Sequence, residues 1–155
     1  MKSYNRGASI QSISPPLPRP FRTFFDSNIL IYAEDPKDNR KQRTALEVIS
    51  QHARRRTGAV SIQVLSEYFS TVTRKLMLDA SLARAQVEFY SLFQVVEPRV
   101  ADVLASIDLH RLRGFSYWDA LILHCAKLAG CRELLTEDMQ HGQVIDGVRI
   151  VNPFL

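Results

Sequence analysis

Four carboxylates, well separated along the chain, are the residues best suited to carry chemistry. They are Asp26, Glu67, Asp119 and Asp138. Oxygen ligands of this kind are what hard divalent cations such as Mg²⁺ require. Packed together without a cation, four carboxylates would repel one another and raise one another's pKa values. These residue types therefore predict a shared divalent-metal site.

Two of the acids also have an ordinary structural use at the start of a helix. Asp26 follows the apolar pair Phe24–Phe25 and precedes a helical pattern, where an Asp commonly serves as the N-cap. Asp119 comes three residues after Ser116, which is the spacing of a capping box, and a carboxylate suits the first turn of a helix. The local context of these two residues leaves both interpretations open.

The other two acids are ambiguous in a different way. Glu67 lies nearly opposite a stripe of apolar residues at helical spacing, formed by Ile62, Leu65, Phe69, Val72 and Leu76. That position suits a solvated side chain or one that faces a wet cleft. Thr136, Glu137 and Asp138 are typical of a polar turn, and nothing local indicates which of the two acids points inward.

The elements that must position these acids alternate between short β-like runs and helical patterns. This order predicts βαβ units around a parallel sheet, in an α/β fold. Ligands of such sheets bind beyond the carboxyl ends of the strands, where the strand order reverses, and Asp26 and Asp138 each follow a predicted strand. The predicted strands are 22–25, 57–60, 95–96, 133–136 and 148–151, with a polar loop before the last. The predicted helices are 28–33 capped by Ser27, 37–56, 62–76, 82–93, 99–113 and 117–129.

The charge of the chain is concentrated at its beginning. The net charge is +4 and the isoelectric point about 9.3. Lys2, Arg6, Arg19 and Arg22 precede every acid, so the 16 remaining basic side chains balance all 16 acidic ones. If the four candidate ligands bind metal, however, 12 acids face 16 bases, which leaves basic surface for a polyanion.

The first 20 residues contain four of the seven prolines and little apolar periodicity, which predicts a flexible extension before a single domain over residues 21–155. Cys125 and Cys131 lack the spacing of a zinc site and are too few for a disulfide framework. We find no stretch long enough to cross a membrane and no secretory signal pattern, so we expect a cytoplasmic protein. The chain contains no GxxxxGK, GxGxxG, GxSxG or HExxH pattern.

Five segments carry a family resemblance. FFDSNILIYAED, VLSEYF, FSYWDALIL, LLTEDMQHG and the closing IVNPF resemble, in their order and spacing, the PIN-domain nucleases, and especially the VapC-type toxins of bacterial toxin–antitoxin pairs. The resemblance runs from about Phe21 to Leu155. It implies a three-layer α/β/α sandwich with a central parallel sheet and an acidic site at the strand ends.

Carried over residue by residue, the resemblance implies that Asp26, Glu67, Asp119 and Asp138 are the metal-binding and catalytic residues. The cofactor would be Mg²⁺, with Mn²⁺ as the alternative ion. We hypothesise that Asp26 and Asp119 bind the principal ion, while Glu67 and Asp138 complete the site or hold a second ion through water.

Three polar neighbours are implied to orient these ligands, namely Ser27, Asn28 and Thr136. Ser27 stands where many relatives have Thr, which keeps a hydroxyl at that position. Basic residues that we expect to steer a nucleic-acid backbone are Arg40, Lys41, Arg43, Arg54 to Arg56, Arg74, Lys75, Arg111 and Arg113.

The function implied is metal-dependent cleavage of RNA by a toxin whose partner is a VapB-type antitoxin, and relatives also pair into homodimers. Two alternatives stay open. One is a PIN-like module that binds RNA or protein without cutting, and the other is an RNA-processing nuclease outside a toxin–antitoxin pair. No motif indicates which RNA is cut.

Overall fold

A computed structural model describes residues 20–155. The predicted extension, residues 1–20, lies outside this part of the chain except for Pro20. The strands are β1 (Arg22–Phe25), β2 (Gly58–Ser61), β3 (Gln94–Val96), β4 (Cys131–Leu135), β5 (Val144–Ile145) and β6 (Val148–Val151). The helices are α1 (Ser27–Tyr32), α2 (Asn39–Arg55), α3 (Ile62–Arg74), α4 (Ala80–Tyr90), α5 (Val100–Arg113) and α6 (Tyr117–Leu128).

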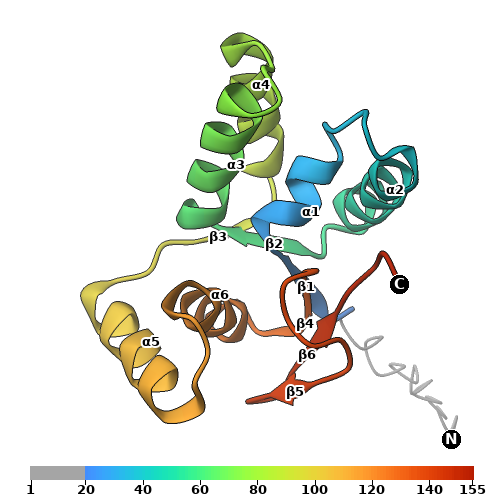
Figure 1. Ribbon diagram of the computed structural model, residues 1–155. Coiled ribbons are helices and arrows are strands. Elements are labelled where there is room, and N and C mark those ends of the chain that lie inside the picture. The colour runs from blue at the N-terminus through green and yellow to red at the C-terminus, as the bar shows by residue number, and fades with distance from the viewer. Residues whose placement is uncertain (1–19) are drawn as a thin grey trace, which may run out of the picture.

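The strands form one sheet in the order β3-β2-β1-β4-β6-β5. Each neighbouring pair from β3 to β6 is parallel. Helices α1 to α4 cover one face of this sheet, and α5 and α6 cover the other (Figure 1). The predicted three-layer α/β/α sandwich is therefore confirmed.

The sheet ends in one antiparallel edge strand, in a segment that the sequence predicts to be a polar loop. Strand β5 lies antiparallel to β6, with Val144 opposite Arg149 and Ile145 opposite Val148. The sequence predicts a polar loop here, because two residues are too short for a visible alternation. Asp146 and Gly147 join the two strands with positive φ angles of 49° and 85°. An Asp-Gly pair is a strong signal for such a two-residue hairpin turn.

Helices α1, α2, α4 and α5 begin one or two residues away from the predicted starts, and N-caps explain the difference in α1 and α2. Asp26, rather than Ser27, caps α1, since its carboxylate accepts a hydrogen bond from the backbone N–H of Ser27 at 2.6 Å. Helix α2 starts two residues later than expected, because the side chain of Asp38 accepts from the N–H of Lys41 at 3.0 Å and so forms the N-cap.

The buried face of α3 also differs from the predicted apolar stripe. Val64, Leu65, Tyr68 and Val72 are buried, whereas Ile62 and Phe69 of the predicted stripe are 46% and 39% exposed. At 100° per residue, the face that is buried is turned towards Glu67 relative to the predicted stripe. Glu67 consequently lies on the flank of the helix that borders the core and not on its solvent side.

The strand order places a reversal between the two central strands. From β1 the chain moves outward through β2 to β3, then crosses to β4 and continues to β6 on the other side. The ends of β1 and β4 therefore border the crevice in which ligands of open α/β sheets bind. Both strands are anchored by a core in which Phe24, Phe25 and Leu134 are fully buried. No helix within residues 20–155 is long and apolar enough to span a membrane.

Candidate active site

Asp26 lies directly after the end of β1, where the strand order reverses. Its backbone N–H donates to the carbonyl of Leu135 at the end of β4 at 3.0 Å, and only 5% of the residue is exposed. One carboxylate oxygen, Oδ1, accepts from the N–H of Ser27. The other, Oδ2, accepts from the hydroxyl of Thr136 at 2.7 Å and from the amide of Asn28 at 3.1 Å.

Asp138 is joined to Asp26 through shared donors. The side-chain amide nitrogen of Asn28 lies 3.0 Å from Asp138 Oδ2, so the same nitrogen contacts both carboxylates. The hydroxyl of Thr136 accepts from the backbone N–H of Asp138 at 3.2 Å while it donates to Asp26. Because Asn28 follows β1 and Thr136 follows β4, these contacts tie the two strand ends together.

Glu67 reaches the same group from α3. The hydroxyl of Ser27 donates to Glu67 Oε2 at 2.9 Å and lies 3.4 Å from Asp26 Oδ1. The amide of Gln63, one helical turn before, donates to Glu67 Oε1 at 2.7 Å. The periodicity of α3 by itself favours a solvated Glu67, whereas the structure places this carboxylate beside Ser27 and Asp26.

Asp119 lies at the same edge of the sheet, in the opposite helical layer. Helix α6 runs back to β4 through Ala129 and Gly130, and its 12 residues span about 18 Å, which matches the length of β4. Its first turn therefore reaches the edge where β4 ends. The backbone N–H of Asp119 donates to the Ser116 hydroxyl at 3.1 Å, which is one half of the capping box that the sequence suggests. Within residues 20–155, the carboxylate of Asp119 makes no hydrogen bond or ion pair.

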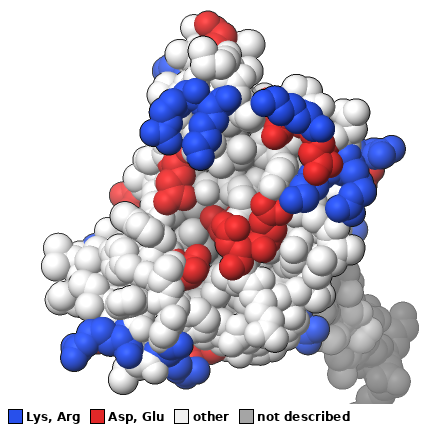
Figure 2. All heavy atoms as spheres, viewed as in Figure 1, with Lys and Arg blue, Asp and Glu red and all other residues white. Residues whose placement is uncertain are grey.

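The electrostatics of the group are strongly unfavourable to a further negative charge. Burial raises the pKa of Asp26 to about 6, and the carboxylates of Asp138 and Glu67 act in the same direction, against the hydrogen bonds from Thr136 and Ser27. Acidic side chains gather around a hollow in the middle of one face of the molecule, with Lys and Arg side chains around it (Figure 2). Such a site favours a cation.

The donor set fits a hard divalent cation in its chemistry. All the candidate ligands offer oxygen, and the side-chain oxygen of Asn28 is buried without a hydrogen-bond partner in the described residues. No three acidic, His or Cys side chains of residues 20–155 stand close enough together to hold a metal ion. Ser27, Asn28 and Thr136 lie between the carboxylates, and mutual repulsion also favours this separation.

The sequence does not indicate which acid of the turn after β4 points inward, whereas the structure does. Asp138 faces Asn28 and Thr136, whereas Glu137 turns towards α2 and pairs with Lys41 at 2.6 Å. This contact raises the pKa of Lys41 above its usual range. The sequence predicts that Lys41 steers nucleic acid, and its pairing with Glu137 is not predicted because it joins positions 96 residues apart.

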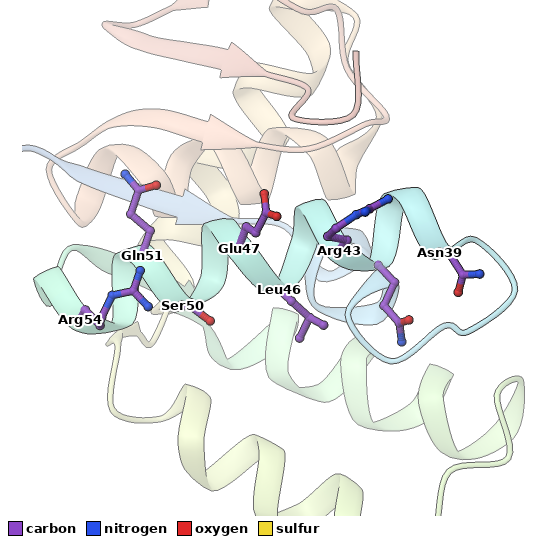
Figure 3. A pocket seen from close by; sticks show the side chains of 8 residues that line it. Asn39, Arg43, Leu46, Glu47, Ser50, Gln51 and Arg54 are labelled. Atoms are coloured by element: carbon purple, nitrogen blue, oxygen red, sulfur yellow. The ribbon is translucent and has the colours of Figure 1, made fainter.

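Other basic residues singled out in the sequence have different surroundings. Arg40 donates to the carbonyl of Phe154 at 2.7 Å, so this guanidinium is engaged within the fold. A depression of about 540 Å³ runs along the outer side of α2, and Arg43 and Arg54 lie along it (Figure 3). Its lining contains one acid, Glu47, and none of Asp26, Glu67, Asp119 and Asp138. We assign it no chemistry.

Comparisons with known proteins agree on the fold. The sequence profile of the PIN domain matches residues 23–145. A toxin–antitoxin complex from Klebsiella pneumoniae is similar in structure, with a TM-score of 0.62 and 22% identity over 84% of this chain and 97% of that chain. Mycobacterium tuberculosis VapC20, described as a sarcin-ricin loop cleaving toxin, gives a TM-score of 0.59 and 18% identity over 72% and 86% of the two chains.

A DNA-bound VapBC complex from Salmonella typhimurium has a TM-score of 0.58 and 20% identity, with coverage of 84% of this chain and 97% of that chain. Curated protein sequences yield no match. The profile match extends from β1 to β5 and includes all four candidate acids. The chain therefore belongs to the PIN-domain family.

Proposed function

We propose that this protein is a Mg²⁺-dependent endoribonuclease, with Mn²⁺ as an alternative ion, that acts as the toxin of a toxin–antitoxin pair. One observation carries the proposal. Asp26, Glu67 and Asp138 are connected by hydrogen bonds through Ser27 and Asn28, at the reversal of strand order. Such a group of carboxylates destabilises the metal-free protein, which is easiest to understand if the group binds a cation.

Hydrolysis of a phosphodiester requires an activated water and relief of the negative charge that builds on the phosphate. A bound divalent ion supplies both, by lowering the pKa of a coordinated water and by neutralising phosphate oxygens. In this proposal Asp26, which follows β1, and Asp119, in the first turn of α6, hold the principal ion. Glu67 and Asp138 complete the site or hold a second ion through water.

The polar neighbours of the acids would fix the direction of each ligand. Thr136 and Asn28 donate to the same oxygen of Asp26, which leaves Oδ1 with the N–H of Ser27. The Ser27 hydroxyl directs Glu67 in the same way. Donors behind a carboxylate ligand hold its orientation and tune its basicity, so we expect Ser27, Asn28 and Thr136 to affect metal affinity.

The biological setting is inferred from the relatives. One similar structure is a toxin–antitoxin complex, and another is a toxin that cleaves the sarcin-ricin loop. We infer a small VapB-type antitoxin as the partner of this chain, RNA as its substrate and the cytoplasm as its location. A homodimer also stays a prediction, for which light scattering after size-exclusion chromatography is the test.

A cleavage assay tests the enzymatic part. Purified protein, RNA and Mg²⁺ should give discrete cleavage products that disappear in excess EDTA. Asp26→Asn and Asp119→Asn should each lower the cleavage rate on the order of 100-fold or more, since each removes an oxygen ligand and a charge. Asp108→Asn is the matched control, because Asp108 is an exposed acid of α5. Equal cleavage by all four proteins would refute the proposal.

The setting is tested by brief expression of the wild type beside Asp119→Asn. Growth arrest by the wild type alone, reversed by the product of an adjacent short reading frame, is the expected outcome. Sequencing of RNA ends from both cultures would then name the substrate. Cleavage without growth arrest would favour RNA processing, and metal-independent RNA binding without cleavage would favour the non-catalytic module.

A further inference from the structure

Lys41 lies where two helices, the turn after β4 and the end of the chain meet. Its ammonium nitrogen is 2.6 Å from Glu137 Oε2 and 3.0 Å from the hydroxyl of Tyr32, which itself donates to Glu137 Oε1. The same nitrogen is 4.4 Å from the ring centre of Tyr32 and 5.4 Å from that of Phe154. About a fifth of the Lys41 and Glu137 side chains is exposed, so solvent only partly screens this pair.

The contact of Lys41 and Tyr32 with Glu137 is adjacent to the cluster of Asp26, Glu67 and Asp138. Asn28 and Tyr32 are four residues apart on α1, so they project from the same face of the helix. Asn28 donates to Asp138, and Tyr32 donates to the preceding residue, Glu137. One face of α1 therefore binds two consecutive carboxylates, those of Glu137 and Asp138. Lys41 from α2 binds Glu137 as well.

Without Glu137, few contacts would hold Asp138 in place. Among the contacts of residues 20–155, its side chain accepts one hydrogen bond, from Asn28, in an exposed position. Its backbone is held by the bond from its N–H to the Thr136 hydroxyl at 3.2 Å. A turn with so few contacts opens easily unless another residue fixes it. Glu137 is that residue, because its two oxygens are bound from two helices.

We propose that Lys41 and Tyr32 are positioning residues, which anchor Glu137 and thereby hold Asp138 in place for cation binding. The inference rests on the proposed cation site but concerns residues outside the carboxylate group. Lys41 touches neither RNA nor metal in this role. It acts through the turn of residues 136–138.

An anchoring role for Lys41 and simple electrostatics predict opposite effects of its removal on the affinity for a divalent cation. Removal of a positive charge near a group of carboxylates should, by Coulomb's law, strengthen the binding of a divalent cation. If Lys41 anchors the turn, its removal should weaken binding, because Asp138 is no longer held in position. Residues that orient ligands typically contribute about 10-fold or more to metal affinity.

The experiment measures Mn²⁺ binding by calorimetry, without RNA, together with amide hydrogen exchange of the peptide that contains residues 136–138. We expect Lys41→Met to weaken Mn²⁺ binding about 10-fold and to accelerate exchange of this peptide. Tyr32→Phe, which removes only the hydroxyl, should act in the same direction by about 3-fold. It also serves if Lys41→Met does not fold.

Arg84→Met is the control, since Arg84 forms an ion pair of similar length, 2.7 Å, with Glu88 on α4. It should leave both measurements unchanged. Unchanged exchange in Lys41→Met and Tyr32→Phe would overturn the proposal, as would unchanged or tighter Mn²⁺ binding. A weaker affinity for RNA with unchanged Mn²⁺ binding would show that Lys41 contacts substrate instead. If the wild type binds no Mn²⁺, the proposed cation site fails, and hydrogen exchange alone decides whether the anchor exists.

Discussion

The metal-free protein should lose stability as the pH rises towards 6, because Asp26 is a buried carboxyl among other carboxylates. Its pKa is raised from 3.8 to about 6. The native state thus binds a proton more tightly than the unfolded chain, and stability falls as pH increases between these two values. At 1.36 kcal/mol per pKa unit, ionisation of Asp26 destabilises the native state by about 3 kcal/mol at neutral pH. About half of this loss develops between pH 5 and pH 8.

The variant Asp26→Asn isolates this effect. The free energy of unfolding would be measured by urea denaturation in EDTA, for wild type and variant, at several values between pH 5 and pH 8. Subtraction of the two curves cancels the other titrating groups and any constant loss from altered hydrogen bonds to Ser27 and Thr136. The difference should shift by about 1–2 kcal/mol in favour of the variant as pH rises. The Asp108→Asn control should run parallel to the wild type.

Mg²⁺ provides the complementary measurement. At 100 times its dissociation constant, an ion that binds only the native state stabilises it by about 2.7 kcal/mol. The wild type should gain this stability at pH 8, and Asp26→Asn should gain little or none. Parallel stability curves of wild type and Asp26→Asn across pH 5 to 8 in EDTA would refute the reasoning, because Asp26 would then ionise as it does in the unfolded chain.

Two further predictions concern the body of the fold. A methyl group at Gly58 would lie 2.5 Å from the ring of Phe93, so Gly58→Ala should lower the free energy of unfolding in urea by about 1–3 kcal/mol, and Phe93→Leu in the same chain should recover part of that loss. Burial raises the pKa of Cys125 and of Cys131 to about 12. Neither thiol of the native protein should therefore react with iodoacetamide at pH 8, whereas both should react in denaturant. Rapid labelling of the native protein would contradict their burial.

The sequence predicts the order of the helices and of all strands except β5, because those patterns are local. The N-terminal boundaries were less accurate where a cap decides them, as Asp38 does for α2. Strand β5 is not predicted because its two residues show no alternation, although the Asp146-Gly147 turn is a usable signal.

Local sequence patterns do not predict those parts of the site in which side chains from distant segments meet. The periodicity of α3 favours a solvated Glu67, because it does not reveal that Tyr68 and Val64 are buried instead of Phe69 and Ile62. The choice between Glu137 and Asp138 depends on partners about 100 residues earlier in the chain, so no local pattern could decide it. The family resemblance supplied the acids, and long-range contacts supplied the arrangement.

Chain direction explains why acids so far apart in sequence converge on one edge. Strands β1 and β4 are parallel neighbours, so Asp26 and the turn that contains Asp138 follow strand ends at the same side of the sheet. Helix α3 leaves that edge from the end of β2 and brings Glu67, whereas α6 begins at that edge and brings Asp119 from the other layer. The fold thus delivers negative charge from both helical layers to the sheet between them. Asp26, in the middle, is the residue whose ionisation this arrangement opposes most, and it is therefore where a cation would stabilise the protein most.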